Sequence, residues 1–431
     1  MKHLSKIVII GNGPAGNEAA SIIRKHGNRA ISMFSKESHP EYSACFLHDF
    51  ISGALDRELL FLKNERDYVS EAIDLFWGRC VYEIDTDQKY VAFEGGKEHY
   101  DQLIIATGSI PIVPKIDGLH LKGVFTFKTL DDAENISAFK ANTVVVVGGG
   151  PIGVEVSIAL KRRGLNVYLI ENEAWILSRI FEERLGNIVK MKIESSGIAV
   201  LNQEEVAKIA GEDKVKAVLL KSNNVIDCDM VVFAMGMMPN THIARNAGLK
   251  LGDLGGIITD ENMATSIPDI YACGDCIELK DSLTQKNVLN ALWPNAVMGG
   301  KVAGLHAIGI SRKFPGPVNL NCIQIYDLTA VSFGYSDSML SGLEGRDVLE
   351  GSMFDGEYRM VLLNGNLVGM QLIAKDDKLI PLCNLVQKKG NFSMMRRAFG
   401  DSEFIRRNPM ACLLLTTRDF HLVKNKGWLL R

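Results

Sequence analysis

Two short apolar runs organise the chain. Residues 7–10 and 144–147 consist only of isoleucine and valine, and such runs predict strands that are buried on both faces, as in a parallel central sheet. A glycine-rich turn follows each run, and each turn leads into a stretch of small residues that predicts a helix. The pattern therefore predicts an α/β fold built from two strand–turn–helix units.

Both turns have the glycine spacing Gly-x-Gly-x-x-Gly. The first glycine allows the tight turn, the second lets the backbone approach a pyrophosphate, and the third lets the helix pack close to the strand. The helix N-terminus then faces the phosphates. Either motif alone is compatible with a purely structural turn, but the pair predicts two nucleotide sites and electron transfer between two cofactors. The glycines are Gly11, Gly13 and Gly16 in the first turn, and Gly148, Gly150 and Gly153 in the second.

Apolar runs that end in glycine turns recur further along the chain. One ends in Ala106-Thr107-Gly108, a second contains Gly236, and a third ends in Gly274-Asp275. A helix is expected from about Pro294 through Lys301. From about residue 319 onwards, short strands with glycine turns predict a smaller α+β domain.

Composition narrows the class of protein. A chain of 431 residues is long enough for roughly three domains. The net charge of -3 argues against a general nucleic-acid binder, and we expect neither a signal peptide nor a membrane span. Scattered cysteines suit reduced thiols rather than a disulfide framework, so a cytoplasmic enzyme is expected. The cysteines are Cys45, Cys80, Cys228, Cys273, Cys276, Cys322, Cys383 and Cys412.

In this order the motifs resemble those of FAD-dependent pyridine-nucleotide oxidoreductases of the disulfide-reductase superfamily. They are most similar to the branch that contains rubredoxin reductases and the flavin module of nitrite reductases. The resemblance implies FAD at the first turn, NAD(P)H at the second, and two Rossmann-like domains followed by an α+β interface domain. The expected boundaries are 1–112 and 255–318 for a discontinuous FAD-binding domain, 113–254 for the NAD-binding domain, 319–390 for the interface domain, and 391–431 for a basic C-terminal extension.

The resemblance also implies which residues contact the cofactors. Asp275 would contact the ribityl or phosphate portion of FAD, and the region 290–301 would bring a helix N-terminus near the flavin ring. The expected FAD contacts are Gly11, Gly13, Pro14, Ala15, Gly16, Ala106, Thr107, Gly108, Gly274 and Asp275. The expected NAD contacts are Gly148, Gly150, Pro151, Ile152, Gly153 and Gly236.

Acidic residues near the strand ends indicate how each nucleotide ribose is bound. The strand after the second turn ends in Glu171, and a carboxylate there binds ribose hydroxyls and repels a 2′-phosphate. The sequence therefore predicts NADH rather than NADPH, although a solvated strand-end carboxylate is the alternative. In the first unit the strand ends at Phe34-Ser35, and Glu37, two residues later, is the candidate contact for the FAD adenosine ribose.

The role of Cys45 determines which electron acceptors such an enzyme can reduce. It occurs in Ser43-Ala-Cys45-Phe-Leu-His48 without a second cysteine five positions along, which excludes the redox disulfide of enzymes similar to lipoamide dehydrogenase. Single-cysteine relatives usually show Cys-Gly-x-Pro, so this chain departs from them. A redox role needs a stabilised thiolate beside the flavin; the alternative is a packed, inert thiol.

Two further candidates are weaker. Glu155 resembles a family glutamate near the nicotinamide, but a carboxylate in a first helical turn is also favoured by the helix dipole. Cys273-Gly-Asp-Cys276 is formally a C-x-x-C motif. Because Asp275 already has an assignment and the sequence has no second pair for a four-ligand site, we expect no metal there.

The resulting hypothesis is an NADH:acceptor oxidoreductase that passes electrons through FAD to an iron–sulfur protein similar to ferredoxin or rubredoxin. Such a cluster would have to sit in another polypeptide, since the chain lacks an iron–sulfur cysteine pattern. The basic extension is either a docking patch for that partner or a solvated tail. An NADH oxidase, peroxidase or CoA-disulfide reductase that uses Cys45 is the alternative, and a redox-sensing flavoprotein subunit is the non-enzyme reading. A homodimer and a subunit of a larger complex both stay open.

Overall fold

The computed structural model describes residues 5–281, 283–289, 291–317, 319–353 and 356–375. Cys383, Cys412, the predicted basic extension 391–431 and Asn290 lie outside the described residues. The chain divides into two compact units. The first comprises residues up to 148, 152–170 and 204–317, and the second comprises 149–151, 171–203 and the residues from 318 onwards.

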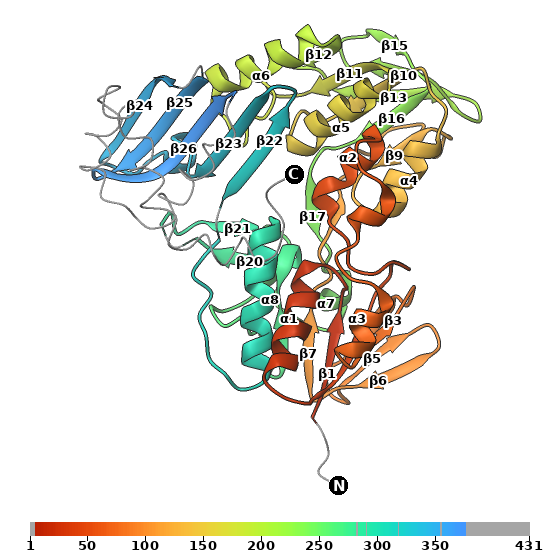
Figure 1. The fold of residues 1–431 in the computed structure, drawn as a ribbon, viewed down its shortest axis with the longest axis vertical. Coiled ribbons are helices and arrows are strands. Elements are labelled where there is room, and N and C mark those ends of the chain that lie inside the picture. Colours follow the sequence, from red (N-terminus) through yellow and green to blue (C-terminus); the bar gives the residue numbers. More distant parts are fainter. Residues whose placement is uncertain (1–4, 282, 290, 318, 354–355, 376–431) are drawn as a thin grey trace. The chain divides into compact units, whose positions relative to one another are not determined.

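A five-stranded parallel sheet forms the centre of the first nucleotide-binding fold (Figure 1). The apolar run 7–10 forms its middle strand, and the side chains of Ile7, Val8 and Ile9 are fully buried, as expected for a strand covered on both faces. The strands, in spatial order, are β19 (Ile270–Ala272), β7 (Gln102–Ile105), β1 (Lys6–Ile10), β2 (Ala30–Phe34) and β3 (Ile73–Phe76).

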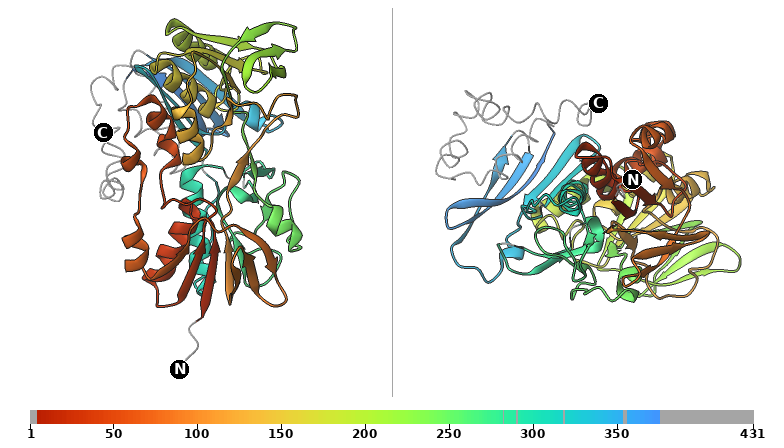
Figure 2. Two further views of the ribbon diagram at one scale, coloured as in Figure 1. Left: turned by 90° about the vertical axis from the view of Figure 1, so that its right-hand side faces the viewer. Right: turned by 90° about the horizontal axis from the view of Figure 1, so that it is seen from below.

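Two helices that are far apart in the sequence pack closely against each other in this fold. Helix α1 (Pro14–Lys25) lies beside α8 (Trp293–Ala307), and Figure 2 shows the same pair from two other directions. A Cβ atom on Gly300 would lie 2.1 Å from the carbonyl oxygen of Ala15, so the contact requires glycine. The predicted helix at Pro294 is confirmed, and its proline occupies the first turn, where a missing N–H costs nothing.

A second parallel sheet repeats the arrangement around the run 144–147. Val144, Val145 and Val146 are fully buried in its strand β10. Within the first unit the order is β11 (Asn166–Glu171), β10 (Thr143–Val147), β16 (Met230–Phe233) and β9 (Val124–Thr126). Helix α5 (Pro151–Arg162) follows β10 directly. The predicted α/β fold with two Rossmann-like units is therefore confirmed.

Smaller elements complete the first unit. Antiparallel sheets are formed by β4 (Val81–Asp85), β5 (Tyr90–Phe93) and β6 (Gly96–His99), by β13 (Val206–Gly211), β14 (Val215–Leu220) and β15 (Val225–Asp227), and by β8 (Ser109–Pro111) with β17 (Met237–Pro239). A mixed sheet contains β18 (Ile257–Ile258), β20 (Ile277–Lys280) and β21 (Asn287–Leu289). The helices are α2 (Leu47–Ser52), α3 (Glu65–Ser70), α4 (Leu130–Ala138) and α7 (His242–Asn246), with 3-10 turns η1 (Ala44–Phe46), η2 (Arg57–Leu60) and η3 (Gly274–Cys276).

The second unit contains an antiparallel sheet with its own apolar core. Phe333, Met360, Met370 and Leu372 are buried together in that core, which agrees with the expected α+β character. The elements are α6 (Glu183–Ser195), β12 (Ile198–Asn202), η4 (Ser338–Leu340) and the sheet strands β22 (Leu320–Ile325), β23 (Leu328–Gly334), β26 (Asn366–Ala374), β25 (Gly356–Leu363) and β24 (Arg346–Met353). The domain boundaries expected from the sequence stay a prediction.

Candidate functional site

The first glycine turn is packed so tightly that two of its glycines cannot be replaced. A Cβ atom on Gly11 would lie 2.0 Å from the carbonyl oxygen of Ala106, and one on Gly16 would lie 2.0 Å from the carbonyl oxygen of Gly11. At Gly13, by contrast, a Cβ would meet nothing within 4 Å. The turn therefore joins β1, β7 and α1 while it leaves open space at the glycine that is predicted to face the pyrophosphate of FAD.

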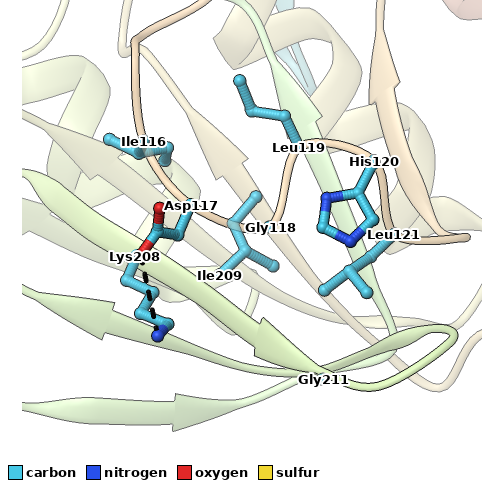
Figure 3. Close-up of a pocket in the computed structure, with 9 residues that line it drawn as sticks. All are labelled: Ile116, Asp117, Gly118, Leu119, His120, Leu121, Lys208, Ile209 and Gly211. Atoms are coloured by element: carbon cyan, nitrogen blue, oxygen red, sulfur yellow. Dashed lines mark ion pairs between the residues drawn. The ribbon is translucent and has the colours of Figure 1, made fainter.

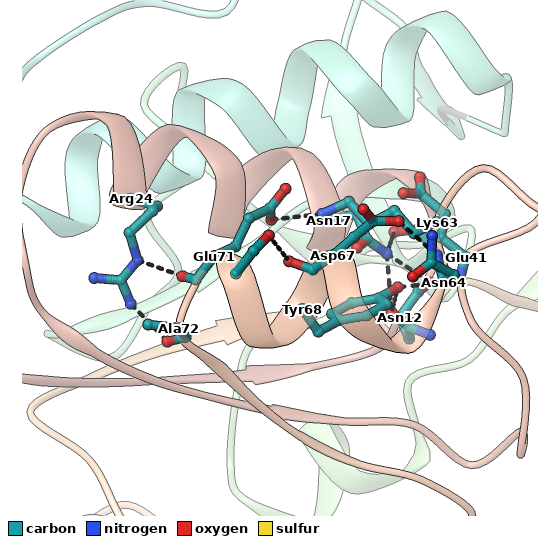
Figure 4. A network of polar contacts seen from close by, with 12 residues as sticks. Asn12, Asn17, Arg24, Glu41, Lys63, Asn64, Asp67, Tyr68, Glu71 and Ala72 are labelled. Atoms are coloured by element: carbon teal, nitrogen blue, oxygen red, sulfur yellow. Dashed lines mark hydrogen bonds and ion pairs between the residues drawn. The ribbon is translucent and has the colours of Figure 1, made fainter.

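Side chains that the sequence analysis missed hold this turn in place (Figure 4). The Asn12 amide donates to the carbonyl of His39 at 3.0 Å, and the Tyr68 hydroxyl donates to Asn12 Oδ1 at 2.8 Å. Asn17, on α1, donates to the Asn12 carbonyl at 2.8 Å. The backbone N–H of Glu41 donates to the Tyr68 hydroxyl at 3.0 Å. The signal in the sequence was the pair of amide side chains next to the motif glycines.

Glu37 lies just beyond β2, where its backbone and its side chain are both held. The Ser35 hydroxyl donates to the Glu37 carbonyl at 2.7 Å. The Tyr42 hydroxyl donates to Glu37 Oε2 at 2.7 Å and accepts a hydrogen bond from the Leu130 N–H at 3.0 Å. Burial raises the pKa of the Glu37 carboxyl, and the hydrogen bond from Tyr42 opposes that rise. Tyr42 thus links the predicted ribose contact to the start of α4.

The remaining FAD motifs converge, although they come from distant parts of the chain. The Thr107 hydroxyl donates to the Asn240 carbonyl at 2.7 Å, and the Asn240 N–H donates to the Gly108 carbonyl at 2.9 Å. The Ser109 hydroxyl donates to Asp275 Oδ2 at 2.8 Å. Nearby, a Cβ atom on Gly274 would approach the Ala15 Cβ to 3.0 Å.

Gly236 is held beside the strand pair β8–β17. Its carbonyl accepts a hydrogen bond from the Ile112 N–H at 3.0 Å, and its φ of 100° is one that glycine adopts readily. Since β8 follows Gly108 and β17 precedes Asn240, this pair aligns the two turns that carry the predicted FAD and NAD contacts.

The second glycine turn repeats the backbone packing of the first. A Cβ on Gly148 would lie 2.4 Å from the Ala234 carbonyl oxygen, and one on Gly153 would lie 1.8 Å from the Gly148 carbonyl oxygen. A Cβ on Gly150 would meet nothing within 4 Å. Pro151 and Ile152 form the start of α5 directly after the open glycine. The geometry fits a second pyrophosphate in the same way.

Glu171 is buried and engages the turn itself. Its Oε2 accepts a hydrogen bond from the Gly149 N–H at 2.6 Å, and its Oε1 accepts one from the Glu173 N–H at 2.8 Å. A carboxylate has about four acceptor positions, so these two bonds leave capacity for ribose hydroxyls. The predicted nucleotide contact is therefore also a structural support of the motif.

Cys45 lies in η1 within a cluster of charged side chains. Although the residue is exposed, desolvation of its thiol by the surrounding protein raises the pKa, and the charge of Glu155 raises the pKa further. A hydrogen bond from Ser43 and the charge of Lys128 lower it. Lys128 also donates to Asp275 Oδ2 at 3.5 Å. Cys45, the candidate redox residue, therefore shares one region of the first unit with Glu155 and Asp275.

The surroundings of Glu155 disfavour the ionised form of its carboxyl group. Burial raises its pKa to about 8, and the nearby charge of Asp49 adds to the rise. His48 Nδ1 lies 3.9 Å from Glu155 Oε2, and His48 Nε2 lies 3.5 Å from Asp49 Oδ1. Burial lowers the pKa of His48, while Asp49 partly offsets that effect. The sequence suggested His48 as a neighbour of Cys45 but gave no sign of its contact with Glu155.

Cys273 and Cys276 are fully buried beside β7. The Cys276 thiol donates to the carbonyls of Cys273 at 3.3 Å and Ile105 at 3.5 Å. Burial raises the pKa of both thiols, which suits packed thiols rather than reactive ones.

One group of possible metal ligands occurs in the described part of the chain, formed by His39, Asp131 and Glu134. His39 already contacts Asp131, and Glu134 is ion-paired with Arg57, so we assign no ion to it.

A surface pocket of about 470 Å³ lies beside β13 (Figure 3). It is formed by the loop from Ile116 to Leu121 and by Lys208, Ile209 and Gly211, with an ion pair of 3.7 Å between Lys208 and Asp117. Its lining includes none of the predicted cofactor contacts. The glycine turns and Cys45 stay the predicted site.

Comparison with known proteins identifies the family of the chain. Residues 5–300, which include both glycine turns and Asp275, match the model of the family described as pyridine nucleotide-disulphide oxidoreductase. The chain belongs to this family. The resemblance seen in the sequence is thereby confirmed, and so are FAD and a pyridine nucleotide as the cofactors of an oxidoreductase.

The relatives of this chain are named for different activities. An NADH oxidase of Methanocaldococcus jannaschii is 36% identical over 75% of this chain and 74% of that protein. A nitrite reductase [NAD(P)H] of Bacillus subtilis is 28% identical over 90% of this chain, which spans only 48% of that protein. The solved structure of an NAD-dependent persulfide reductase from A. fulgidus superposes with a TM-score of 0.86 at 26% identity, covering 91% of this chain and 78% of that one.

No helix in the described part of the chain is long and apolar enough to cross a membrane.

Proposed function

We propose that the chain oxidises NADH and passes two electrons to a disulfide, persulfide or oxygen acceptor at Cys45. The observation that carries the proposal is the exposed residue Cys45, whose thiol is influenced by the charges of Glu155, Lys128 and Asp275. The NADH oxidase and persulfide reductase named among the relatives support it. For a disulfide acceptor the balance is NADH + H⁺ + R–S–S–R′ → NAD⁺ + R–SH + R′–SH.

The residues of the chain supply binding, orientation and a nucleophile. In this proposal Gly13 and Glu37 hold FAD, whereas Gly150 and Glu171 hold NADH. Bound FAD supplies an acceptor for the hydride and a source of the same two electrons. The Cys45 thiolate attacks one sulfur of the acceptor, which forms a mixed disulfide and expels R–S⁻, and this thiolate takes one proton to give R–SH. Two electrons and a second proton then release R′–SH and restore the Cys45 thiolate.

Substitution of Cys45 tests this function directly. The Cys45→Ser variant should retain FAD and its bleaching by NADH under anaerobic conditions. Its kcat/KM with coenzyme A disulfide or persulfide should fall at least about 100-fold, because the nucleophile is lost. Cys80→Ser is the matched control, since Cys80 is also exposed and should change turnover less than about 2-fold. Full disulfide turnover by Cys45→Ser would contradict the proposal.

A one-electron iron–sulfur carrier is the second candidate acceptor. It is favoured by the raised pKa of Cys45, which works against a reactive thiolate at neutral pH, and by the nitrite reductase among the relatives. Wild-type protein that reduces a ferredoxin or a rubredoxin rapidly, is inert towards disulfides and is unaffected by Cys45→Ser would establish this candidate in place of the first. The docking role of residues 391–431 stays a prediction.

A further inference from the structure

His48 stands between two carboxyl groups next to Cys45. It lies in the first turn of α2, and its two ring nitrogens face different partners: Nδ1 is 3.9 Å from Glu155 Oε2, and Nε2 is 3.5 Å from Asp49 Oδ1. The side chain of Asp49 is 30% exposed, whereas those of His48 and Glu155 are 21% and 22% exposed. The three groups thus form a row from the more exposed carboxylate of Asp49 to the carboxyl of Glu155, whose charge acts on the Cys45 thiol.

The charges around this row favour movement of a proton along it. The pKa of Glu155 is raised to about 8, so this carboxyl holds a proton at neutral pH. Burial lowers the pKa of His48, the charge of Asp49 opposes that shift, Arg162 adds to it, and a hydrogen bond to the Cys45 backbone opposes it. The net shift is downward, so the ring is a neutral base at neutral pH. The charges of Lys128 and Asp275 also act on Cys45, where Lys128 lowers the pKa of the thiol and Asp275 raises it. A carboxylic acid beside a neutral imidazole can exchange one proton without creating a net charge.

We propose that His48 and Glu155 form a proton-transfer pair, in which Glu155 delivers a proton at Cys45 and His48 returns one from solvent. The balance requires one proton from solvent, because NADH brings two electrons and one proton while reduction of a disulfide to two thiols consumes two protons, and this pair is a route for that proton. This inference rests on the proposed function in placing the reaction at Cys45. Because 3.9 Å is too long for a direct hydrogen bond, proton transfer between the two groups would pass through a bridging water.

The pH profile of turnover is the first test. Wild-type kcat/KM for the disulfide acceptor should fall as pH rises through about 8, because the proton on Glu155 is lost there. Glu155→Gln should abolish that fall and lower kcat/KM about 100-fold at pH 7, as expected for loss of a general acid. His48→Gln should lower it about 10- to 100-fold, with an unchanged KM for NADH. His26→Gln is the control, since His26 follows the C-terminal end of α1, whose other end carries the glycine turn.

Two measurements separate proton transfer from a merely structural role. Added imidazole should restore activity to His48→Ala several-fold, and FAD absorbance should match the wild type in each variant. Alkylation of Cys45 by iodoacetamide should move to lower pH in Glu155→Gln, because a negative charge that raises the thiol pKa is removed.

Wild-type pH profiles in His48→Gln and Glu155→Gln, together with no rescue by imidazole, would overturn the proton-transfer pair. That result combined with an inactive Cys45→Ser would leave the proposed function standing. Full activity of Cys45→Ser would instead remove the proposed function.

Discussion

The two glycine turns have the same backbone packing but are held by different side chains. In both, the first and third glycines have no room for a Cβ, while the middle glycine has open space. The first turn is fixed by a network of neutral groups, Asn12, Asn17 and Tyr68, and its acid Glu37 bonds elsewhere, to Tyr42. The second turn is fixed by its own acid, Glu171, through the Gly149 N–H.

This difference determines whether nucleotide binding at each site depends on the residue that holds the turn. The first turn keeps its shape through uncharged hydrogen bonds that are independent of Glu37, which suits a cofactor that stays bound. In the second, one carboxylate both shapes the turn and is the predicted ribose contact, so nucleotide binding and turn geometry depend on the same residue. Substitutions in the first turn should therefore impair FAD retention, whereas substitutions in the second turn should impair the reaction with NADH.

The largest effects are expected at the third glycines. Gly16→Ala would place a Cβ 2.0 Å from a backbone oxygen and should yield protein that loses FAD on gel filtration, because the turn must open. Gly153→Ala would place one at 1.8 Å and should retain FAD absorbance while its bleaching by NADH is lost. Each clash should also cost about 1–3 kcal/mol of stability, measured as a lowered melting temperature.

Substitutions at the middle glycines provide the control for those clashes. Gly13→Ala and Gly150→Ala meet no atom within 4 Å, so their melting temperatures without nucleotide should equal that of the wild type. Their methyl groups enter the predicted pyrophosphate space, so FAD or NADH affinity alone should fall. Equal loss of stability in all four variants would refute the distinction between packed and open glycines.

An intermediate effect is expected from Glu171→Ala. It removes two hydrogen bonds between a carboxylate and the backbone, each worth about 1.5–3 kcal/mol, and it removes the charge that disfavours a 2′-phosphate. The KM for NADH should rise about 10- to 100-fold, and discrimination against NADPH should disappear. Steady-state kinetics with both nucleotides measures this.

Glu173→Ala is the matched control, because Glu173 is exposed and contributes its backbone N–H rather than its side chain to the contact with Glu171. Its kinetic constants should stay near those of the wild type. A wild-type preference for NADPH would show that Glu171 does not select the nucleotide.

The sequence predicted the elements of this comparison but not what holds them. The apolar runs around Ile7 and Val144 and the glycine spacing are local signals, so the strands, turns and helices follow from short segments. The contacts of Tyr68 with Asn12 and of His48 with Glu155 join residues that are far apart in the chain. Only the packing of several elements brings these residues together. A single sequence does not reveal which residues that are distant in the chain lie close together in space.

The smallest effect, and the most specific to the first turn, is expected from Tyr42→Phe. The hydroxyl donates to Glu37 and accepts from the Leu130 N–H, so its loss should cost about 1 kcal/mol and weaken FAD binding about 5-fold. Because this hydrogen bond lowers the pKa of Glu37, the variant should lose FAD at a higher pH on acidification than the wild type does. Fluorescence titration of free FAD against pH measures both. Tyr82→Phe, at an exposed position, should leave the titration unchanged, and a Tyr42→Phe curve that overlays the wild type would mean that Glu37 does not bind FAD.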